Sequence, residues 1–413
     1  MKKKYKILII HNSFFMGGGA DIIAYNSFKL LQEHGHEVFY FSLDTKPYFE
    51  ENYEYAKYFY KLPQKKNFID YLKNISNYYY NKNAAKQLEK LLDEINPDIV
   101  HAHTLYGLTY AVLKPCLNRK IPVVKTMHSA KIVCPAESLL LNNKTYCKKH
   151  LCIKGKYKYC ILNKCQQNSF YSSICASLSN KINDLTGYHN KISKFVAPSL
   201  SIKNLVLKAG FNERKIELIE NFINDDFLNI DPNYTNRGYF LFVGRLYPPK
   251  GVHYLLKAVK TLPKDIKFHI VGFGPQEDEL KKYCIENNLD NVEFLGYQTQ
   301  EQIKDEYKKS IALIVPSICF EAFGVINLEA FACGKPVIAS KIGGIADIVE
   351  NNNSGLLFEP ENIEEMAKHI KTLWEDKELA ITMGKNAKAQ VNKYSKEQHY
   401  KKLYSLYNSI GVK

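Results

Sequence analysis

Hydrophobic positions along the chain fall into short apolar runs that alternate with stretches of helical spacing. The first run, KILII at 6–10, predicts a short buried strand, and a loop with three glycines follows it. The segment ADIIAYNSFKLLQEHG at 20–35 then has helical spacing and ends at Gly35, a favoured residue for a helix C-cap. HEVFYFS at 36–42 predicts the next strand. This order is typical of the opening βαβ unit of a parallel sheet.

The same alternation continues in two series. Further strands of the first series are predicted at 97–103, 121–128 and 194–199. A second series begins near Arg237, with predicted strands at 238–246, 266–274, 292–297, 310–317, 335–340 and 354–360. Two such series predict an α/β protein of two doubly wound, Rossmann-like domains, with the polar stretch 222–236 as the join. Ligands of such folds bind beyond the carboxyl ends of the strands, so we expect the site in the cleft between the domains.

Composition supports a globular protein of this size and weakens any argument from net charge. The chain has 413 residues, 46% hydrophobic and 24% charged, with a formal net charge of +15. Four of its 57 basic residues are Arg, namely Arg119, Arg214, Arg237 and Arg245. Heavy use of Lys, Asn, Ile and Tyr is typical of an AT-rich genome. The charge alone therefore does not specify an anionic partner, whereas an Arg at a glycine-flanked strand end is informative.

The start of the chain and its cysteines indicate a compartment. The apolar run near the beginning is too short for a signal peptide, and no window approaches the length of a membrane span. Ten cysteines without a signal peptide indicate thiols or metal ligands rather than disulfides. We expect a cytoplasmic protein.

The segment EAFGVINLE carries the first candidate site. Glu321 follows a predicted strand in a loop just before a helix N-terminus, and Glu329 lies in the second turn of that helix. Backbone N–H groups near Phe323 and Gly324 would be free to bind oxygen ligands. Carboxylates suit sugar hydroxyls because they accept hydrogen bonds from adjacent OH groups. The alternative is a pair of solvated helix carboxylates.

Cations and glycines follow other strands. Arg245 and Lys250 in FVGRLYPPKG would form a diphosphate clamp, although two surface cations at a turn are the alternative. Gly272 and Gly274 form only half of a dinucleotide fingerprint. The run Gly17–Gly19 would let the backbone approach a phosphate closely, unless it is simply a flexible loop. The chain has no Asp-x-Asp pair, which argues against a metal-bound diphosphate of that type.

These motifs together resemble a known family. GGG after the first strand, GRLYPPKG, VGFGP, VEFLGY and EAFGVINLEAFACGKPVIASKIGGIADIVENNNSGLLF resemble the retaining glycosyltransferases of the large glycogen-synthase-like family, group 1 or family 4, with the GT-B fold. The resemblance is dense from about 241 to 360 and looser in the N-terminal half. It implies an acceptor-binding domain at 1–222, a nucleotide-sugar-binding domain at 223–390, and a C-terminal helix at 391–413 that packs back on the first domain.

The resemblance also implies roles for individual residues in metal-independent transfer, with no cofactor required for catalysis. Arg245 and Lys250 would hold the diphosphate, Glu321 the hydroxyls of the donor sugar, and Glu329 the ribose. The amides of Phe323, Gly324 and Val325 would assist. The remaining donor contacts would come from Gly18, Gly19, Gly272, Gly296 and Tyr297.

His128, in VVKTMHS, would contact the donor sugar near the reacting carbon. The sequence departs from the family pattern at Ser129, where Asp or Asn is more usual, and at Asp347, where Glu is commoner. His101 and His103 also lie at a strand end, and either a place on the acceptor side of the cleft or a structural role fits them.

A cysteine-rich segment follows His128. The four residues Cys134, Cys147, Cys152 and Cys165, or three of them with His150, would suit a closed structural zinc site. Their spacing is not that of a standard CxxC pair, and free thiols are the alternative. The candidate metal is therefore a structural zinc.

Residues 46–90 are rich in Tyr and Lys. Basic and aromatic residues together suit an anionic membrane surface that bears a lipid-linked acceptor, whereas solvated helix faces with Tyr in the core are the alternative. The expected partners are a nucleotide-diphosphate sugar and a glycan or lipid-linked acceptor, in cell-surface polysaccharide synthesis on the inner face of the membrane.

Other functions remain as alternatives. One is a sugar-nucleotide epimerase on the same fold, although the arrangement EAFGVINLE does not suit it; a glycan phosphorylase would need a pyridoxal-phosphate Lys in a much longer chain. The other, from a different class, is a basic nucleic-acid-binding protein, for which we find no binding module. We therefore expect no nucleic acid partner.

Overall fold

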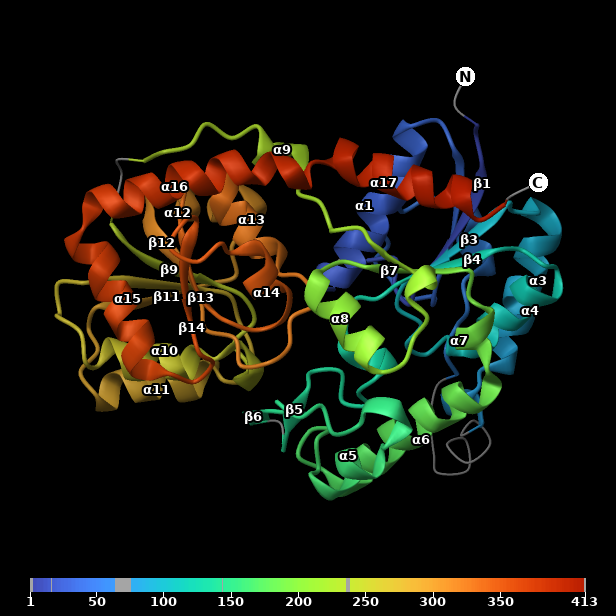
Figure 1. Cartoon of the computed structure of the whole chain (residues 1–413), viewed down its shortest axis with the longest axis horizontal. Coiled ribbons are helices and arrows are strands. Elements are labelled where there is room, and N and C mark those ends of the chain that lie inside the picture. Colours follow the sequence, from blue (N-terminus) through green and yellow to red (C-terminus); the bar gives the residue numbers. More distant parts are fainter. Residues whose placement is uncertain (1–2, 16, 64–75, 143, 235–237, 412–413) are drawn as a thin grey trace.

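The computed structural model describes residues 3–15, 17–63, 76–142, 144–234 and 238–411. Within these ranges two six-stranded parallel sheets form the centres of two α/β domains that lie side by side (Figure 1). The predicted class, α/β with two Rossmann-like domains, is confirmed.

The N-terminal sheet has the strand order β2-β1-β3-β4-β7-β8, and its neighbouring strands are parallel. Its strands are β1 (Lys6–Ile10), β2 (Glu37–Phe41), β3 (Ile99–Ala102), β4 (Val123–Thr126), β7 (Lys194–Ala197) and β8 (Ile216–Leu218). The helices of this half are α1 (Gly19–Glu33), α3 (Lys82–Ile95), α4 (Leu113–Asn118), α5 (Lys158–Leu162), α6 (Phe170–Thr186), α7 (Tyr188–Lys191) and α8 (Leu200–Lys208). A short hairpin, β5 (Leu140–Leu141) with β6 (Thr145–Tyr146), stands apart from the sheet.

The C-terminal sheet has the order β11-β10-β9-β12-β13-β14, again parallel. Its strands are β9 (Tyr239–Val243), β10 (Phe268–Val271), β11 (Val292–Gly296), β12 (Ser310–Val315), β13 (Val337–Ser340) and β14 (Gly355–Phe358). The helices are α9 (Asp225–Leu228), α10 (Val252–Val259), α11 (Glu277–Glu286), α12 (Gln300–Lys309), α13 (Val325–Ala332), α14 (Gly343–Ile348), α15 (Ile363–Glu375), α16 (Lys377–Val391) and α17 (Lys396–Ser409).

The last helix returns to the first domain. Figure 1 shows α16 over the C-terminal domain and α17 crossing onto the N-terminal one. Tyr407 of α17 hydrogen-bonds through its hydroxyl to His101 Nδ1 at 2.7 Å, and Tyr400 does so to His36 Nε2 at 3.0 Å. The two domains are therefore tied both by the join after β8 and by the C-terminal helix.

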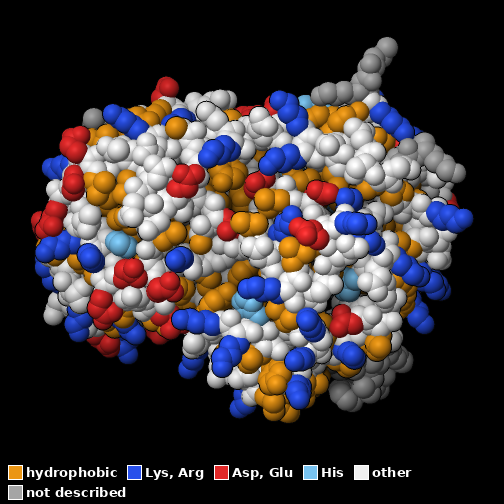
Figure 2. Space-filling model, in the orientation of Figure 1, with side chains coloured by type: hydrophobic (Ala, Val, Ile, Leu, Met, Phe, Trp, Pro, Cys, Tyr) orange, Lys and Arg blue, Asp and Glu red, His pale blue; other side chains and the backbone are white. Residues whose placement is uncertain are grey.

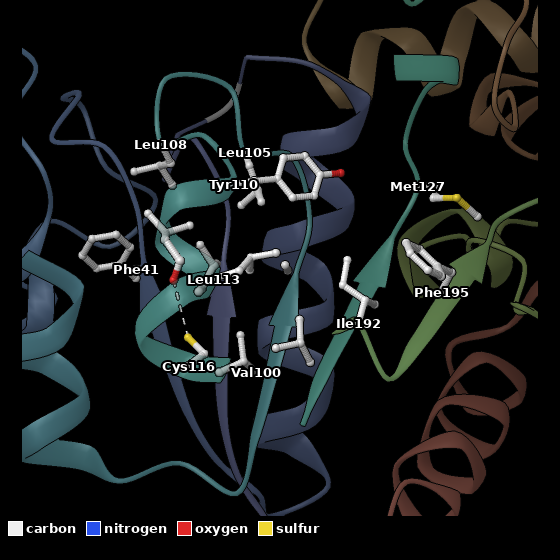
Figure 3. Packing of buried hydrophobic residues seen from close by; sticks show 14 of the residues in the cluster. Phe41, Val100, Leu105, Leu108, Tyr110, Leu113, Cys116, Met127, Ile192 and Phe195 are labelled. Atoms are coloured by element: carbon white, nitrogen blue, oxygen red, sulfur yellow. Dashed lines mark hydrogen bonds between the residues drawn. The ribbon is translucent and has the colours of Figure 1, made fainter. Parts of the chain in front are cut away.

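Strands covered on both faces explain the continuous apolar runs of the sequence. Successive side chains of a strand point to opposite faces, so Leu8 and Ile10 of β1 enter one core while Ile7 and Ile9 enter another. In the first of these cores (Figure 3), the region of α4 packs on the sheet, and the Cys116 thiol donates to the carbonyl oxygen of Val112.

The helix ends predicted at Gly35 and Gly334 are confirmed, whereas strand β8 and the β5–β6 hairpin were not predicted. The chain has φ of +76° at Gly35 and +72° at Gly334, the left-handed conformation in which glycine closes a helix. Strand β8 was missed because it is only three residues long, and the hairpin because it lies in the cysteine-rich segment. No helix in the described ranges has the length and apolarity needed to cross a bilayer.

Candidate active site

The sheet topology brings the C-terminal motifs to one edge. Strands β11, β10, β9, β12 and β13 are neighbours and parallel, so their carboxyl ends share that edge. Gly296 ends β11, while Gly272, Arg245 and Glu321 follow β10, β9 and β12. Residues that are as much as 76 positions apart in sequence therefore belong to one site.

Lys250 and Glu321 form an ion pair at this edge. Lys250 Nζ contacts Glu321 Oε1, and Ser317 Oγ donates to the same carboxylate oxygen at 3.0 Å. Burial lowers the pKa of the Lys250 ammonium, but the Glu321 carboxylate outweighs this effect, and the pKa stays above its ordinary value. Arg245 is exposed, with its guanidinium carbon 5.6 Å from the centre of the Tyr247 ring. This edge thus presents two cations: Lys250, which is paired with Glu321, and Arg245, which faces solvent.

The Glu321 loop is held by the loop after β13. The amide of Gly344 donates to the carbonyl oxygen of Glu321 at 2.7 Å. A Cβ on Gly343 would lie 2.4 Å from that same oxygen, and the φ of this residue is +53°. Only glycine allows this approach, so the KIGG motif acts as a support for Glu321.

Helix α13 places Glu329 as expected, in its second turn. The helix starts at Val325, and its N-cap Gly324 has a φ of +98°. Tyr307 donates a hydrogen bond to Glu329 Oε2 at 3.1 Å. Burial raises the pKa of Glu329 to about 7, although the bond from Tyr307 opposes the shift. Glu329 can therefore titrate near neutral pH.

The glycines after β10 let two loops pack closely. A Cβ on Gly272 would lie 1.9 Å from the carbonyl oxygen of Gly244, and one on Gly274 would lie 2.3 Å from that of Leu246. These glycines therefore allow the loop after β10 to pack directly against the backbone of the Arg245 loop. Beside them, Tyr297 and Phe273 are 72% and 56% exposed, with ring centres 6.2 Å apart.

Histidines gather at the corresponding edge of the N-terminal sheet. Strands β1, β3 and β4 are adjacent, and His11, His103 and His128 follow them. His103 Nδ1 and His128 Nε2 are hydrogen-bonded at 2.8 Å, with their rings stacked at 5.1 Å. His101 lies deeper, bonded to Thr126 Oγ1 at 2.8 Å and to the helix α17. Of the two histidines left open by the sequence, His103 therefore contacts His128 and His101 does not.

Burial keeps the histidines of this edge neutral. It lowers the pKa of His103 and of His128 well below the ordinary value. It also lowers the pKa of Lys125 to about 8; the Lys125 ammonium donates to the carbonyl oxygen of His103 at 2.6 Å. His128 itself is only partly covered, so a neutral imidazole is offered to a ligand.

The glycine loop after β1 is anchored through Asp21. This side chain accepts from His11 Nε2 at 2.8 Å and from the Ser13 hydroxyl. Burial raises the pKa of Asp21, but these hydrogen bonds outweigh it and lower the pKa overall. Gly18 is the N-cap of α1, and Gly19 begins the helix with open space around it. The start of α1 thus leaves room at Gly19, beside the Asp21 carboxylate, which already accepts a hydrogen bond from the Gly18 amide.

Direct contacts between the domains lie close to both edges. Ser201 donates through its amide to Asp347 Oδ2 at 2.7 Å, joining α8 to α14. The amide of Phe320 donates to the carbonyl oxygen of Ser138 at 3.0 Å. The Glu321 loop is therefore packed against the segment that follows His128. A cavity of about 630 Å³ opens beside this contact, lined on its two sides by residues that include Lys144 and Tyr254.

The cysteine-rich segment folds together. Cys134, Cys147, Cys152 and Cys165, with His150, line one small cavity. The burial of Cys152 raises the pKa of its thiol to about 12. Across the residues that the structure describes, no three His, Cys, Asp or Glu side chains are arranged to hold a metal ion. The four cysteines thus share a cavity but are not arranged as metal ligands, and the zinc stays a prediction.

Several residues of these edges were missed by sequence reasoning. They are His11, Asp21, Phe273, Tyr307 and Ser317. Each is an ordinary residue in its own segment, and its part in the site shows only in its contacts in the folded protein. The position of Phe273, between Gly272 and Gly274, was the one available signal.

The sequence of the chain is similar to those of known proteins. The model for Glycosyltransferase Family 4 matches residues 17–227, about half of the chain, and the model for Glycosyl transferases group 1 matches 224–390. An uncharacterized glycosyltransferase of Methanocaldococcus jannaschii is 28% identical over 347 residues, covering 83% of this chain and 84% of its own. The poly(ribitol-phosphate) alpha-N-acetylglucosaminyltransferase of Staphylococcus aureus is 30% identical over 205 residues, 48% of this chain and 41% of its own.

Solved structures show the same fold. HepE of Anabaena, in complex with UDP-glucose, superposes with a TM-score of 0.70 at 20% identity, covering 98% of this chain and all of its own. TarM of S. aureus does so with a TM-score of 0.67 at 17% identity, covering 98% of this chain and 99% of its own. The chain belongs to glycosyltransferase family 4, with the group 1 glycosyltransferase domain as its C-terminal half.

Proposed function

We propose that the protein is a retaining, metal-independent glycosyltransferase that moves a sugar from a nucleotide-diphosphate sugar to a glycan or lipid-linked glycan acceptor. The observation that carries this proposal is the Lys250–Glu321 pair beside the exposed Arg245, at the carboxyl ends of neighbouring strands. Two cations offset the two charges of a diphosphate, and a carboxylate next to them accepts bonds from sugar hydroxyls.

The donor lies along the C-terminal edge in the proposed complex. Arg245 and Lys250 hold the diphosphate, Glu321 holds the sugar, and Glu329 holds the ribose. The amides of Phe323, Gly324 and Val325 at the start of α13 assist. The base lies at Gly296 and Tyr297, and the exposed ring of Phe273 offers a second aromatic surface there.

The N-terminal edge completes the reaction site. Amides at Gly18 and Gly19 face the diphosphate, and the neutral imidazole of His128 contacts the sugar near its anomeric carbon. The bond between that carbon and the phosphate oxygen breaks as the acceptor oxygen bonds to the same face. The acceptor proton passes to the departing phosphate, so the configuration is retained without an enzymic nucleophile. Arg245 and Lys250 stabilise the negative charge that develops on this leaving group.

The biological role rests on similarity. The relatives include the S. aureus poly(ribitol-phosphate) alpha-N-acetylglucosaminyltransferase, whose name gives a polymer as its acceptor. We infer a role in cell-surface polysaccharide synthesis, at the cytoplasmic face of a membrane. A structural zinc in the cysteine-rich segment is a separate part of the proposal.

A donor panel with EDTA tests the function. Purified protein is incubated with UDP-, GDP-, ADP- and dTDP-sugars and with lipid-linked glycans from the source membrane, and release of nucleoside diphosphate is followed. We expect release from one donor with EDTA present, and a product whose anomeric proton coupling matches that of the donor. An inverted product or an absolute need for a divalent cation contradicts the proposal. Conversion of the nucleotide sugar into its epimer without any acceptor would establish the epimerase alternative.

A further inference from the structure

Helix α6 presents an unexpected face to solvent. Its buried positions are Ser173, Ser177 and Asn180, all of them polar. Ser177 Oγ donates to the carbonyl oxygen of Tyr157 at 3.3 Å, and Asn180 Nδ2 donates to the carbonyl oxygen of Lys131 at 2.8 Å. The helix is therefore attached to the domain by hydrogen bonds rather than by apolar packing.

The apolar residues of α6 point outward instead. Phe170, Ile174, Leu178 and Leu185 are 54%, 37%, 43% and 74% exposed. At 3.6 residues per turn they fall within about 80° of one another, so they form one stripe along the helix. Leu162 of the neighbouring α5 adds a further apolar side chain that is 69% exposed. Contiguous exposed apolar surface of this kind marks an interaction site.

The segment that carries this stripe is strongly basic. Residues 142–191 contain nine Lys and one acidic residue, Asp184. The nine are Lys144, Lys148, Lys149, Lys154, Lys156, Lys158, Lys164, Lys181 and Lys191, and each is exposed. Figure 2 shows apolar and basic side chains mixed over the lower protrusion of the molecule, which Figure 1 identifies as α5 and α6.

We propose that this face, Leu162 with the stripe of α6 and the surrounding lysines, docks the protein on an anionic lipid bilayer. An apolar strip flanked by Lys is the pattern of a helix that lies in the membrane interface, where long Lys side chains reach the headgroups. The face protrudes, and a bilayer needs no complementary groove to receive it. The excess of Lys over acidic residues in this segment matches an anionic surface better than a protein surface of mixed charge.

The aromatic segment that the sequence pointed to is a weaker candidate for this surface. In its described part, Tyr48, Phe49 and Tyr53 pack around the buried Phe14. They are therefore part of a core. Tyr78 of the same prediction is 47% exposed, and its residues 64–75 lie outside the described ranges.

Docking through α6 would serve the proposed function, on which only this part of the inference rests. Lys131, whose carbonyl holds Asn180, lies three residues after His128. The bilayer would thus be next to the segment that borders the reaction site, where a lipid-linked acceptor arrives.

Vesicle sedimentation tests the surface. The full-length protein is mixed with vesicles of phosphatidylcholine alone or of phosphatidylcholine and phosphatidylglycerol at 7:3. We expect binding only to the anionic vesicles, reduced by added salt. Leu178→Ser with Leu185→Ser should weaken the partition coefficient about tenfold or more. Lys156→Glu with Lys158→Glu should weaken it further, because each Lys near a charged surface contributes about fivefold.

The control variants lie on α11 of the other domain. Ile285→Ser removes an apolar side chain that is 78% exposed, and Lys282→Glu reverses an exposed charge. Both should bind vesicles as the wild type does, and equal melting temperatures check that all variants fold. Unchanged binding in the α6 variants, or no binding of the wild type to anionic vesicles, overturns the proposal.

Two further readouts separate the alternatives. If the α6 variants change the molar mass in light scattering, the stripe is an interface between copies of the chain, and the bilayer proposal is wrong. Affinity for a nucleotide sugar should be the same in wild type and α6 variants. Vesicle binding without any nucleotide-sugar binding would leave the docking surface in place and refute the proposed function instead.

Discussion

The two strand-end edges that face the reaction site are built on opposite principles. The C-terminal edge offers charge: Arg245 is exposed, and Lys250 is paired with Glu321. The N-terminal edge offers neutral imidazoles, because burial lowers the pKa of His103 and His128. The difference suggests a division of labour. In the proposed complex, the C-terminal edge holds the diphosphate of the leaving group, and the N-terminal edge places neutral imidazoles near the sugar.

The glycines differ in the same way. In the C-terminal domain Gly272 and Gly343 are fixed against backbone carbonyls, whereas Gly19 in the N-terminal domain has nothing within 4 Å of its Cβ position. Gly272 and Gly343 therefore position loops, whereas Gly19 leaves room for a ligand. Four predictions address this comparison.

The largest effect on activity is expected from Lys250, one of the two cations proposed to hold the diphosphate. Lys250→Ala should lower kcat/KM for transfer about 10³-fold, because it removes charge stabilisation from the leaving group. Initial rates of nucleoside diphosphate release measure it. Lys257→Ala, an exposed Lys on α10, is the matched control and should leave the rate unchanged. A Lys250 variant with near wild-type rate would place the diphosphate elsewhere.

The supporting glycines should matter for folding. Gly272→Ala should destabilise the protein by about 2–4 kcal/mol, since its Cβ would meet the Gly244 carbonyl and its φ is +129°. Thermal or urea unfolding checks this value. A stable Gly272→Ala protein would mean that the loop has room to move.

Glu329 should make donor binding depend on pH. Its pKa, raised by burial to about 7, means that most molecules carry a protonated carboxyl at pH 6 and a carboxylate at pH 8. The carboxylate accepts both ribose hydroxyls, so the Kd for a nucleotide sugar should be about tenfold weaker at pH 6 than at pH 8. Calorimetry at both pH values measures it. Glu329→Gln should bind with no such dependence, and a persistent slope in that variant would assign the titration to another group.

The smallest effect is expected at the open glycine. Gly19→Ala should change the free energy of unfolding by no more than about 0.5 kcal/mol, because the methyl group meets nothing and φ is not left-handed there. Urea unfolding beside Gly272→Ala gives the direct contrast. Equal destabilisation by the two substitutions would remove the distinction between the loops.

The same contrast explains what the sequence could predict. The C-terminal motifs are local: a strand, a glycine and then a charged residue, as in FVGRLYPPKG, so the strand order brings them together without further information. The N-terminal edge depends on contacts between distant segments. His103 contacts His128, and His101 contacts Tyr407 in the last helix. No local pattern specifies such pairs.

Helix α6 shows a second limit. Apolar spacing by itself assigns the apolar stripe of a helix to the core. Here Ser173 and Ser177 are buried while Ile174 and Leu178 are exposed. The inversion follows from the hydrogen bonds of the buried face, which are visible only in the folded protein.

The most direct test of the central claim is calorimetric titration of the nucleotide-sugar panel in EDTA, with wild type and the Arg245→Ala and Lys250→Ala variants. The two-cation account predicts metal-free binding of one donor, and an affinity at least about tenfold weaker in each variant. Binding that appears only when a divalent cation is added, or that both variants retain at wild-type strength, would contradict it.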